Sequence, residues 1–168
     1  MGTDSVEDFM VIQATATALK PLDTQWSPVS SVFTQPLWSI SVKQRLIELT
    51  KLPENWDSYG SPAVKSKSVE IALDILARLS QFNMTEPHVV PVPGGGIQFE
   101  WANQTSELEI EIRPSGDVEF LVVDKADEML EGSIDQSFDS QQLFCVSNWF
   151  LSERKSVNEL LRTDVPTY

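Results

Sequence analysis

The sequence predicts a single α+β domain with two N-terminal helices, a four-stranded antiparallel β-meander and a long C-terminal helix. Between Val89 and Asp124, apolar and polar residues alternate with a period of two, which is typical of strands with one buried and one exposed face. The segments before and after it, within 39–81 and 140–162, carry apolar residues at helical spacing. The helices are expected to pack on the apolar face of the sheet.

The composition is that of a folded domain. The chain has 168 residues, of which 41% are hydrophobic, and a net charge of −13. Disorder requires low hydrophobicity as well as high charge, so global disorder is excluded, and this length suits one ordinary domain. The single cysteine, Cys145, cannot form an intrachain disulfide, and neither a secretory signal nor a membrane-spanning apolar run is visible. A cytoplasmic location is therefore expected.

Residues 1–36 are predicted to form an extended or partly ordered N-terminal arm, and residues 37–168 to form the α+β domain. The arm contains Pro21, Pro28 and Pro36 among several Ser and Thr residues, a composition typical of an extended connection. It is expected either to lie along the domain or to reach a partner.

Two helices are predicted before the sheet. The first starts near Ser39, with Ser39 or Ser41 as N-cap, and ends before Pro53. Its apolar face comprises Val42, Leu46 and Leu49, with Ile47 beside them. The second runs from Ser66 to Gln81 and is expected to be buried on more than one side, because its apolar stripe is wide: Val69, Ile71, Ala72, Leu73, Ile75, Leu76, Leu79 and Phe82.

The loop between these helices, Asn55 to Pro62, contains turn-forming residues and two large aromatic ones, Trp56 and Tyr59. We expect both rings to be anchored, and both are candidates for contacting a partner, because Trp and Tyr are enriched in binding hot spots. The alternative is structural: Trp56 fills the gap between the helices, and Asp57 accepts hydrogen bonds from loop amides.

The register of the meander follows from the parity of its apolar residues. The strand from His88 to Pro93 is expected at an edge because its prolines lack an N–H, and Gly94 to Gly96 then turns the chain. Facing residues of an antiparallel pair share a face, which sets Trp101 opposite Leu108 and Ile112 opposite Val118. A further consequence of this register is that two pairs of acids face each other: Glu100 with Glu109, and Glu111 with Glu119.

The remainder of the chain is expected to be a loop followed by a helix. Residues 125–139 are acidic and poorly patterned, and Gly132 interrupts any helix there. From about Ser140 to Arg162, helical spacing links five apolar residues: Leu143, Val146, Phe150, Val157 and Leu161.

Negative charge is concentrated in the sheet and the segment after it. Between Ile97 and Ser140 there are twelve acidic residues and two basic ones, a net charge of −10. Such a field repels nucleic-acid phosphates and anionic membranes and attracts basic proteins. A basic protein partner is therefore expected, with no direct binding to nucleic acid or membrane.

The candidate binding surface is a group of glutamates that should share the exposed face of the sheet, here called the Glu face: Glu100, Glu107, Glu109, Glu111 and Glu119. Facing carboxylates repel each other, and a partner's Arg and Lys or a hard divalent cation would relieve this repulsion. A plain solvated face remains the simplest interpretation. No catalytic set, metal-ligand motif or cofactor motif is recognised.

Two stretches, LPENWDSYGSPAV and HVVPVPGGGIQFEW followed by ELEIEIRPSGDVEFLV, resemble a family of small uncharacterised bacterial and phage-borne proteins. That family has an Asn-Trp-Asp-x-Tyr-Gly motif and a Pro-x-Pro-x-Gly-Gly-x-Gln-x-Glu-Trp motif. The resemblance covers about residues 52–124 and implies a common domain core and a prokaryotic source, but no activity. The order of elements and the acidic character also look like small secretion chaperones, an analogy at the level of the fold.

Three functions are compatible with these features. The first is non-enzymatic recognition of a basic protein through the Glu face, as an antitoxin, immunity protein, inhibitor or chaperone would do. The second is a divalent-metal hydrolase that uses Glu100, Glu109, Glu111 and Glu119. The third is a phage or assembly component that self-associates, for instance as a dimer, through the edge strand Val89 to Val92 or through the N-terminal arm.

Overall fold

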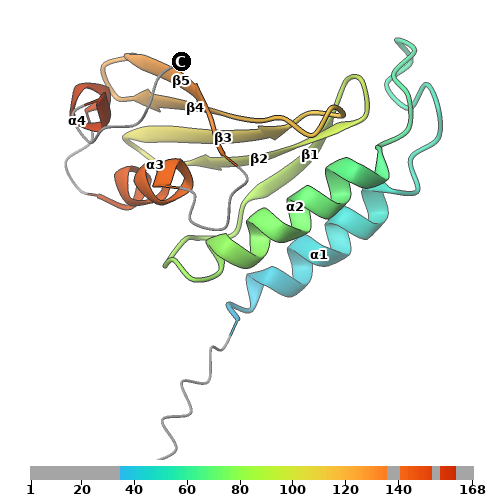
Figure 1. Cartoon of the computed structure of the whole chain (residues 1–168), viewed down its shortest axis with the longest axis horizontal. Helices are drawn as coiled ribbons and strands as arrows, with labels where there is room; N and C mark the ends of the chain where they lie inside the picture. The colour runs from blue at the N-terminus through green and yellow to red at the C-terminus, as the bar shows by residue number, and fades with distance from the viewer. Residues whose placement is uncertain (1–34, 136–140, 153–155, 162–168) are drawn as a thin grey trace, which may run out of the picture. The chain divides into compact units, whose positions relative to one another are not determined.

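The computed structural model describes residues 35–135, 141–152 and 156–161 of the chain (Figure 1). Apart from its last two residues, the predicted N-terminal arm lies outside the described residues. The elements follow in the order α1 (Trp38–Leu49), α2 (Ser66–Leu79), β1 (His88–Val92), β2 (Gly96–Ala102), β3 (Ser106–Ile112), β4 (Val118–Asp124), β5 (Met129–Ser133), α3 (Gln141–Leu151) and α4 (Val157–Leu161). The α+β class is confirmed.

The sheet has five antiparallel strands in sequential order, so the prediction of four strands was wrong by one. The additional strand, β5, lies within the segment 125–139 that was predicted to be a loop. Its residues MLEGS show no apolar alternation, so the sequence pattern does not reveal a strand there. The pairing of β5 with β4 rests on backbone hydrogen bonds instead, and next to the strand Ile134 N–H donates to Val118 O at 2.8 Å. The Phe120 ring covers Gly132, where a Cβ would lie 2.6 Å from the ring.

The predicted registers of β2 with β3 and of β3 with β4 are confirmed. Trp101 faces Leu108 and Ile112 faces Val118, and the two predicted glutamate pairs are present. The β3–β4 turn is closed by Gly116, which has a φ of +101°, a conformation that residues with a side chain rarely adopt. The edge position of β1 is also confirmed.

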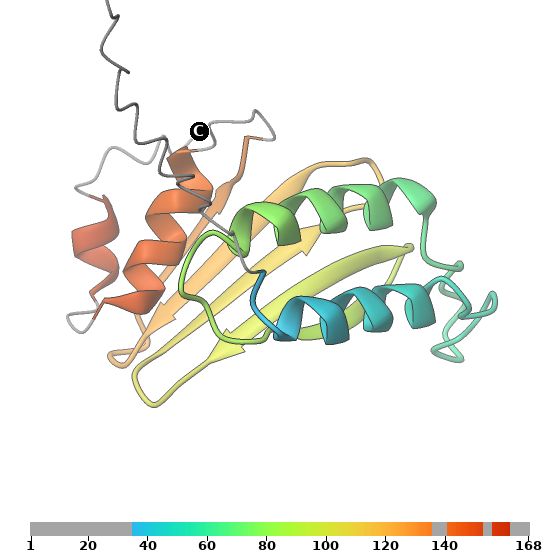
Figure 2. The same cartoon turned by 90° about the horizontal axis from the view of Figure 1, so that it is seen from below.

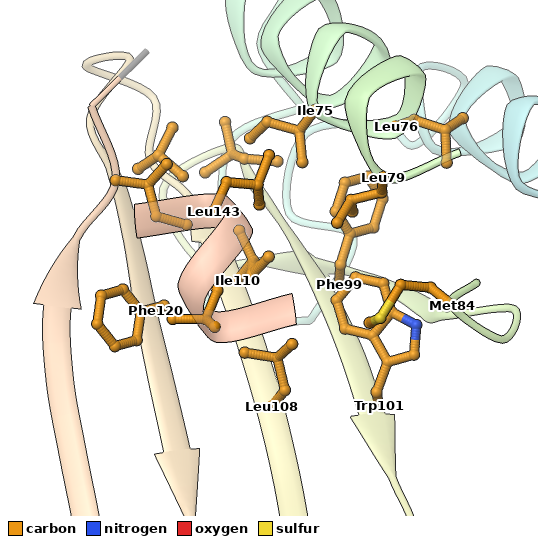
Figure 3. Close-up of a cluster of buried hydrophobic side chains, with 14 of the residues drawn as sticks. Ile75, Leu76, Leu79, Met84, Phe99, Trp101, Leu108, Ile110, Phe120 and Leu143 are labelled. Atoms are coloured by element: carbon orange, nitrogen blue, oxygen red, sulfur yellow. The ribbon is translucent and has the colours of Figure 1, made fainter. Parts of the chain in front are cut away.

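The hydrophobic core lies between one face of the sheet and the helices. Figure 2 shows α1 and α2 side by side over the same face, and α3 and α4 contact β3 and β4. Figure 3 shows side chains of α2 and α3 meeting those of β2, β3 and β4. The sheet contributes ten buried apolar residues: Val89, Ile97, Phe99, Trp101, Leu108, Ile110, Ile112, Val118, Phe120 and Val122. The helices of the described residues therefore pack on one face of the sheet, as predicted.

The helices before the sheet differ from prediction at their ends and flanks. Leu37 occupies the N-cap of α1 without a side-chain hydrogen bond, so the prediction of a serine cap was wrong. The helix start is fixed instead by Trp38, whose indole N–H donates to Met84 O at 3.0 Å. Ile47 and Leu73 are 51% and 40% exposed, so the apolar side of each helix is narrower in the structure than in the sequence pattern.

The long C-terminal helix was predicted wrongly, because the chain forms two short helices there, α3 and α4. Leu143, Val146, Phe150 and Val157 are nevertheless buried as expected. The break allows the start of α4 to meet the end of β4, where the buried carboxylate of Asp124 accepts a hydrogen bond from Val157 N–H at 3.1 Å. The same carboxylate accepts hydrogen bonds from the backbone N–H groups of Ala126 and Glu128.

Replacing Asp124 by Asn is expected to lower the free energy of unfolding at pH 7 by about 1–3 kcal/mol, because buried N–H donors lose an acceptor. Chemical denaturation measures this change. The matched control is Asp127→Asn, which removes a charge from an exposed position of the same turn and should have little effect.

The destabilisation by Asp124→Asn should also shrink at low pH. Burial by itself would raise the pKa of Asp124, but the N–H groups of Val157, Ala126 and Glu128, with Lys125 nearby, lower it below its ordinary value. Such a carboxylate stabilises the fold above its unfolded pKa of about 3.9, and this contribution is lost as the pH falls through the folded pKa. An equal loss at pH 7 and below pH 3 would contradict this role.

Candidate acidic binding face

The side of the sheet opposite the helices is here called the outer face. The five glutamates of the Glu face lie on it. All described helices lie on the other side of the sheet (Figures 1 and 2). The structure brings together all five predicted residues, because Glu100, Glu107, Glu109, Glu111 and Glu119 project from adjacent strands β2, β3 and β4. Strand β5 adds a sixth glutamate, Glu131, which faces Leu121. Sequence reasoning missed Glu131 because its segment lacks a strand pattern.

The strand register arranges these side chains in two rows that cross the sheet. The first row runs from β1 to β5 through His88, Glu100, Glu109, Leu121 and Glu131. The second row consists of Val90, Gln98, Glu111, Glu119 and Ser133. These rows place Glu100, Glu109, Glu111 and Glu119 on the three central strands and Glu131 on the edge strand β5.

Glu100 and Glu109 form the closer of the two facing pairs. Asn103 N–H donates to Ser106 O, and this bond sets which β2–β3 pairs exchange backbone hydrogen bonds. By alternation, Glu100 and Glu109 form a pair without such bonds, in which Cα atoms lie about 4.5 Å apart rather than about 5.5 Å. Their side chains are correspondingly close.

The pKa of Glu109 is raised above its ordinary value. Burial is the largest cause, and the negative charges of Glu100, Glu107 and Glu111 add to it. Leu121 lies directly across from Glu109 on β4 and is half-buried, so water has access to this carboxylate from fewer sides. The fold therefore disfavours the ionised form of Glu109.

The basic side chains of the outer face contact Glu100, Glu111 and Glu119. Arg113 pairs with Glu119 at 2.5 Å and lies 3.7 Å from Glu111, while His88 Nδ1 lies 3.0 Å from Glu100. Gln98 also donates to Glu100, at 3.1 Å. Within the described part of the chain, no salt bridge or side-chain hydrogen bond reaches Glu107, Glu109 or Glu131.

A hollow of about 460 Å³ opens on the outer face between β3 and β5. Its lining combines carboxylates with apolar and backbone groups: Glu109, Glu111, Arg113, Glu119, Phe120, Leu121, Glu131, Gly132 and Ser133. Beside it, the register aligns Val123 with Met129, whose side chain is 67% exposed. Leu121, Val123 and Met129 thus form an apolar strip next to the carboxylates of the outer face. A surface that contacts only water does not need such a strip.

The carboxylates of the Glu face do not form a metal-ligand set. They are distributed over three strands, and no group of three or more His, Cys, Asp or Glu side chains among the described residues could hold a metal ion. The geometry required by the hydrolase hypothesis is therefore missing from residues 35–135, 141–152 and 156–161. None of the helices in these ranges is long and apolar enough to cross a membrane.

The loop that carries Trp56 and Tyr59 lies away from the Glu face, beyond the ends of α1 and α2 (Figure 1). The predicted role of Asp57 is confirmed: it accepts hydrogen bonds from Tyr59 N–H at 2.9 Å and Ser61 N–H at 3.1 Å. Trp56 is half-buried and donates to Pro62 O, but it does not pack against the core, so it does not fill the gap between the helices. The expectation that Tyr59 is anchored was wrong, since its side chain is 94% exposed.

No protein-family model, curated protein or solved structure matches this chain. The resemblance to the bacterial and phage-borne family therefore stays a prediction.

Replacing Glu109 by Gln is expected to stabilise the protein at pH 7 by about 0.2–1 kcal/mol, the range for relieving a like-charge cross-strand pair. The sign follows from the raised pKa, since ionised Glu109 costs stability at any pH above its folded pKa. The gain should disappear as the pH falls toward the unfolded pKa of about 4.3, where wild-type Glu109 is protonated.

Urea titrations at pH 7 and pH 4 measure both effects. The matched control is Glu54→Gln, which removes one charge from an exposed glutamate of the helix-connecting loop. Destabilisation by Glu109→Gln at pH 7 would show that Glu109 already has a compensating cation.

Proposed function

We propose that this protein is a non-enzymatic binding protein that recognises a basic protein partner through the outer face of its sheet. The observation that carries the proposal is the state of Glu109. It is half-buried, it has a raised pKa, and three other glutamates surround it without any cation of the described chain in contact. An Arg or Lys side chain from a partner would supply the missing charge.

The net charge of residues 1–34 favours a cation supplied by a partner over one supplied by this segment. Residues 1–34 contain four acidic residues and one lysine, so their net charge of −3 does not complement the outer face. The apolar strip formed by Leu121, Val123 and Met129 gives the same surface an area that gains from being covered. Antitoxins, immunity proteins, inhibitors of basic enzymes and secretion chaperones all act by such recognition.

The observations favour this function over the two alternatives. The metal-dependent hydrolase requires three or more ligands around one ion, and no such group occurs among the described residues. Self-assembly through the β1 edge requires free backbone groups on that strand. There, however, Arg45 Nε donates to Val89 O at 3.2 Å, and Pro91 has no N–H.

Charge reversal at Glu109 and Glu131 tests the proposal. The variant Glu109→Lys/Glu131→Lys changes two acids that have no cation in contact, and it should weaken binding of the partner at least about tenfold. The partner is first captured from the source organism with the wild-type protein, and its affinity is then measured by calorimetry at low and high salt.

The matched control is Glu54→Lys/Glu70→Lys, which makes the same change in net charge at two exposed positions outside the outer face. It should retain the partner at close to wild-type affinity. Equal weakening by both variants would indicate general attraction by net charge, and an unchanged affinity in the outer-face variant would contradict the proposal.

A further inference from the structure

The two edges of the sheet differ in whether another strand can be added. In an antiparallel sheet, alternate residues of an edge strand direct their N–H and C=O groups away from the neighbouring strand. On β1, those residues are Val89 and Pro91, because Val89 O is the group that receives the Arg45 side chain. Helix α1 contacts β1. Proline, a hydrogen-bonded carbonyl and an adjacent helix are all features that block an edge.

The backbone of β5 is arranged in the opposite way. Ile134 N–H donates to Val118 O, and Asp124 N–H donates to Glu128 O at 3.1 Å, so the even-numbered residues of this hairpin exchange hydrogen bonds with β4. The odd-numbered residues Met129, Glu131 and Ser133 therefore direct their N–H and C=O groups toward the free edge.

Within the described ranges, this edge is uncovered. Strand β5 pairs only with β4, and Met129, Glu131 and Ser133 are all exposed. The strand contains no proline, and no side chain of the described residues bonds to its outer backbone groups. Strand β5 thus offers unpaired donors and acceptors at a regular spacing, the arrangement that an extended peptide recognises.

Charge decides which strand can occupy the edge. A second copy of β5 paired antiparallel about Glu131 would set Glu131 against Glu131 and join two acidic outer faces. An extended segment with Lys or Arg at alternate positions would instead extend the row of His88, Glu100, Glu109, Leu121 and Glu131 with a cation. The hollow on the outer face begins at Glu131 and Ser133, so a long basic side chain has room to reach toward Glu109.

We propose that a basic, extended segment of the partner protein adds to β5 as a sixth strand and places its alternate Lys or Arg side chains over the outer face. This inference rests on the proposed function, because it describes how the same basic partner is held. The backbone of β5 supplies the alignment, and the glutamates select the charge.

The test uses the whole protein and a short synthetic peptide in which lysine alternates with valine. The control peptide has the same sequence with methyl groups on the backbone nitrogens of its lysines, which keeps the charge and removes the N–H donors that would pair with β5. The unmodified peptide should bind, and methylation should weaken binding more than roughly tenfold, because several hydrogen bonds are lost together.

A substitution in β5 tests the edge without changing charge. Ser133→Pro removes an N–H that points away from β4 and should weaken binding of the unmodified peptide roughly three- to tenfold, whereas Ser133→Ala should leave it unchanged. Hydrogen exchange in the wild-type protein gives a readout independent of any variant. The amides of Met129, Glu131 and Ser133 should exchange at least roughly tenfold more slowly when the peptide is bound.

Failure of this inference is distinguishable from failure of the proposed function. If both peptides bind equally and binding is lost in Glu109→Lys/Glu131→Lys, the outer face binds basic chains but strand addition is wrong. If the β5 amides stay unprotected in the complex, strand addition is likewise wrong. If neither peptide binds, strand addition is overturned, and the proposed function is decided by the affinity of the captured partner for Glu109→Lys/Glu131→Lys.

Discussion

The backbone register of β3 with its two neighbours determines what each face of the sheet presents. Burial of Leu108, Ile110 and Ile112, all fully buried, contributes about 1.5–3 kcal/mol for each side chain. A facing pair of like charges costs about 0.2–1 kcal/mol, so the apolar residues fix the register and the glutamates must accept it. A slip by one residue would expose the apolar set, which is why the fold tolerates acids gathered at the centre of the outer face.

The same alternation explains why the two edges of the sheet are unequal. Strand β1 lies beside α1, and its outward backbone groups are reduced by Pro91 and occupied by Arg45. Helices α3 and α4, which cover another part of the buried face of the sheet, contact β3 and β4. Of the described elements, none supplies β5 with a comparable cover, so the acidic surface and the open edge meet on one side of the molecule.

Parity made most of the sheet predictable from the sequence. The parity of the apolar residues predicted the facing pairs, including Glu100 with Glu109. Strand β5 was not predictable, because its segment has no alternating pattern and is held by backbone bonds to β4. The break between α3 and α4 was hidden because Val157 keeps the helical spacing although a distant residue, Asp124, holds its N–H. Because β5 was not predicted, its Glu131 was missing from the predicted binding surface.

The central claim is that Glu109 lacks a cation in the free protein and that a basic partner supplies one. Titration of the Glu109 side-chain carboxyl by ¹³C NMR, with and without the basic partner, tests it most directly. The account predicts a pKa above the ordinary value in the free protein and a marked fall of that pKa in the complex, because a nearby cation favours the carboxylate. A pKa of Glu109 that is the same in both states, with the partner bound, would contradict it.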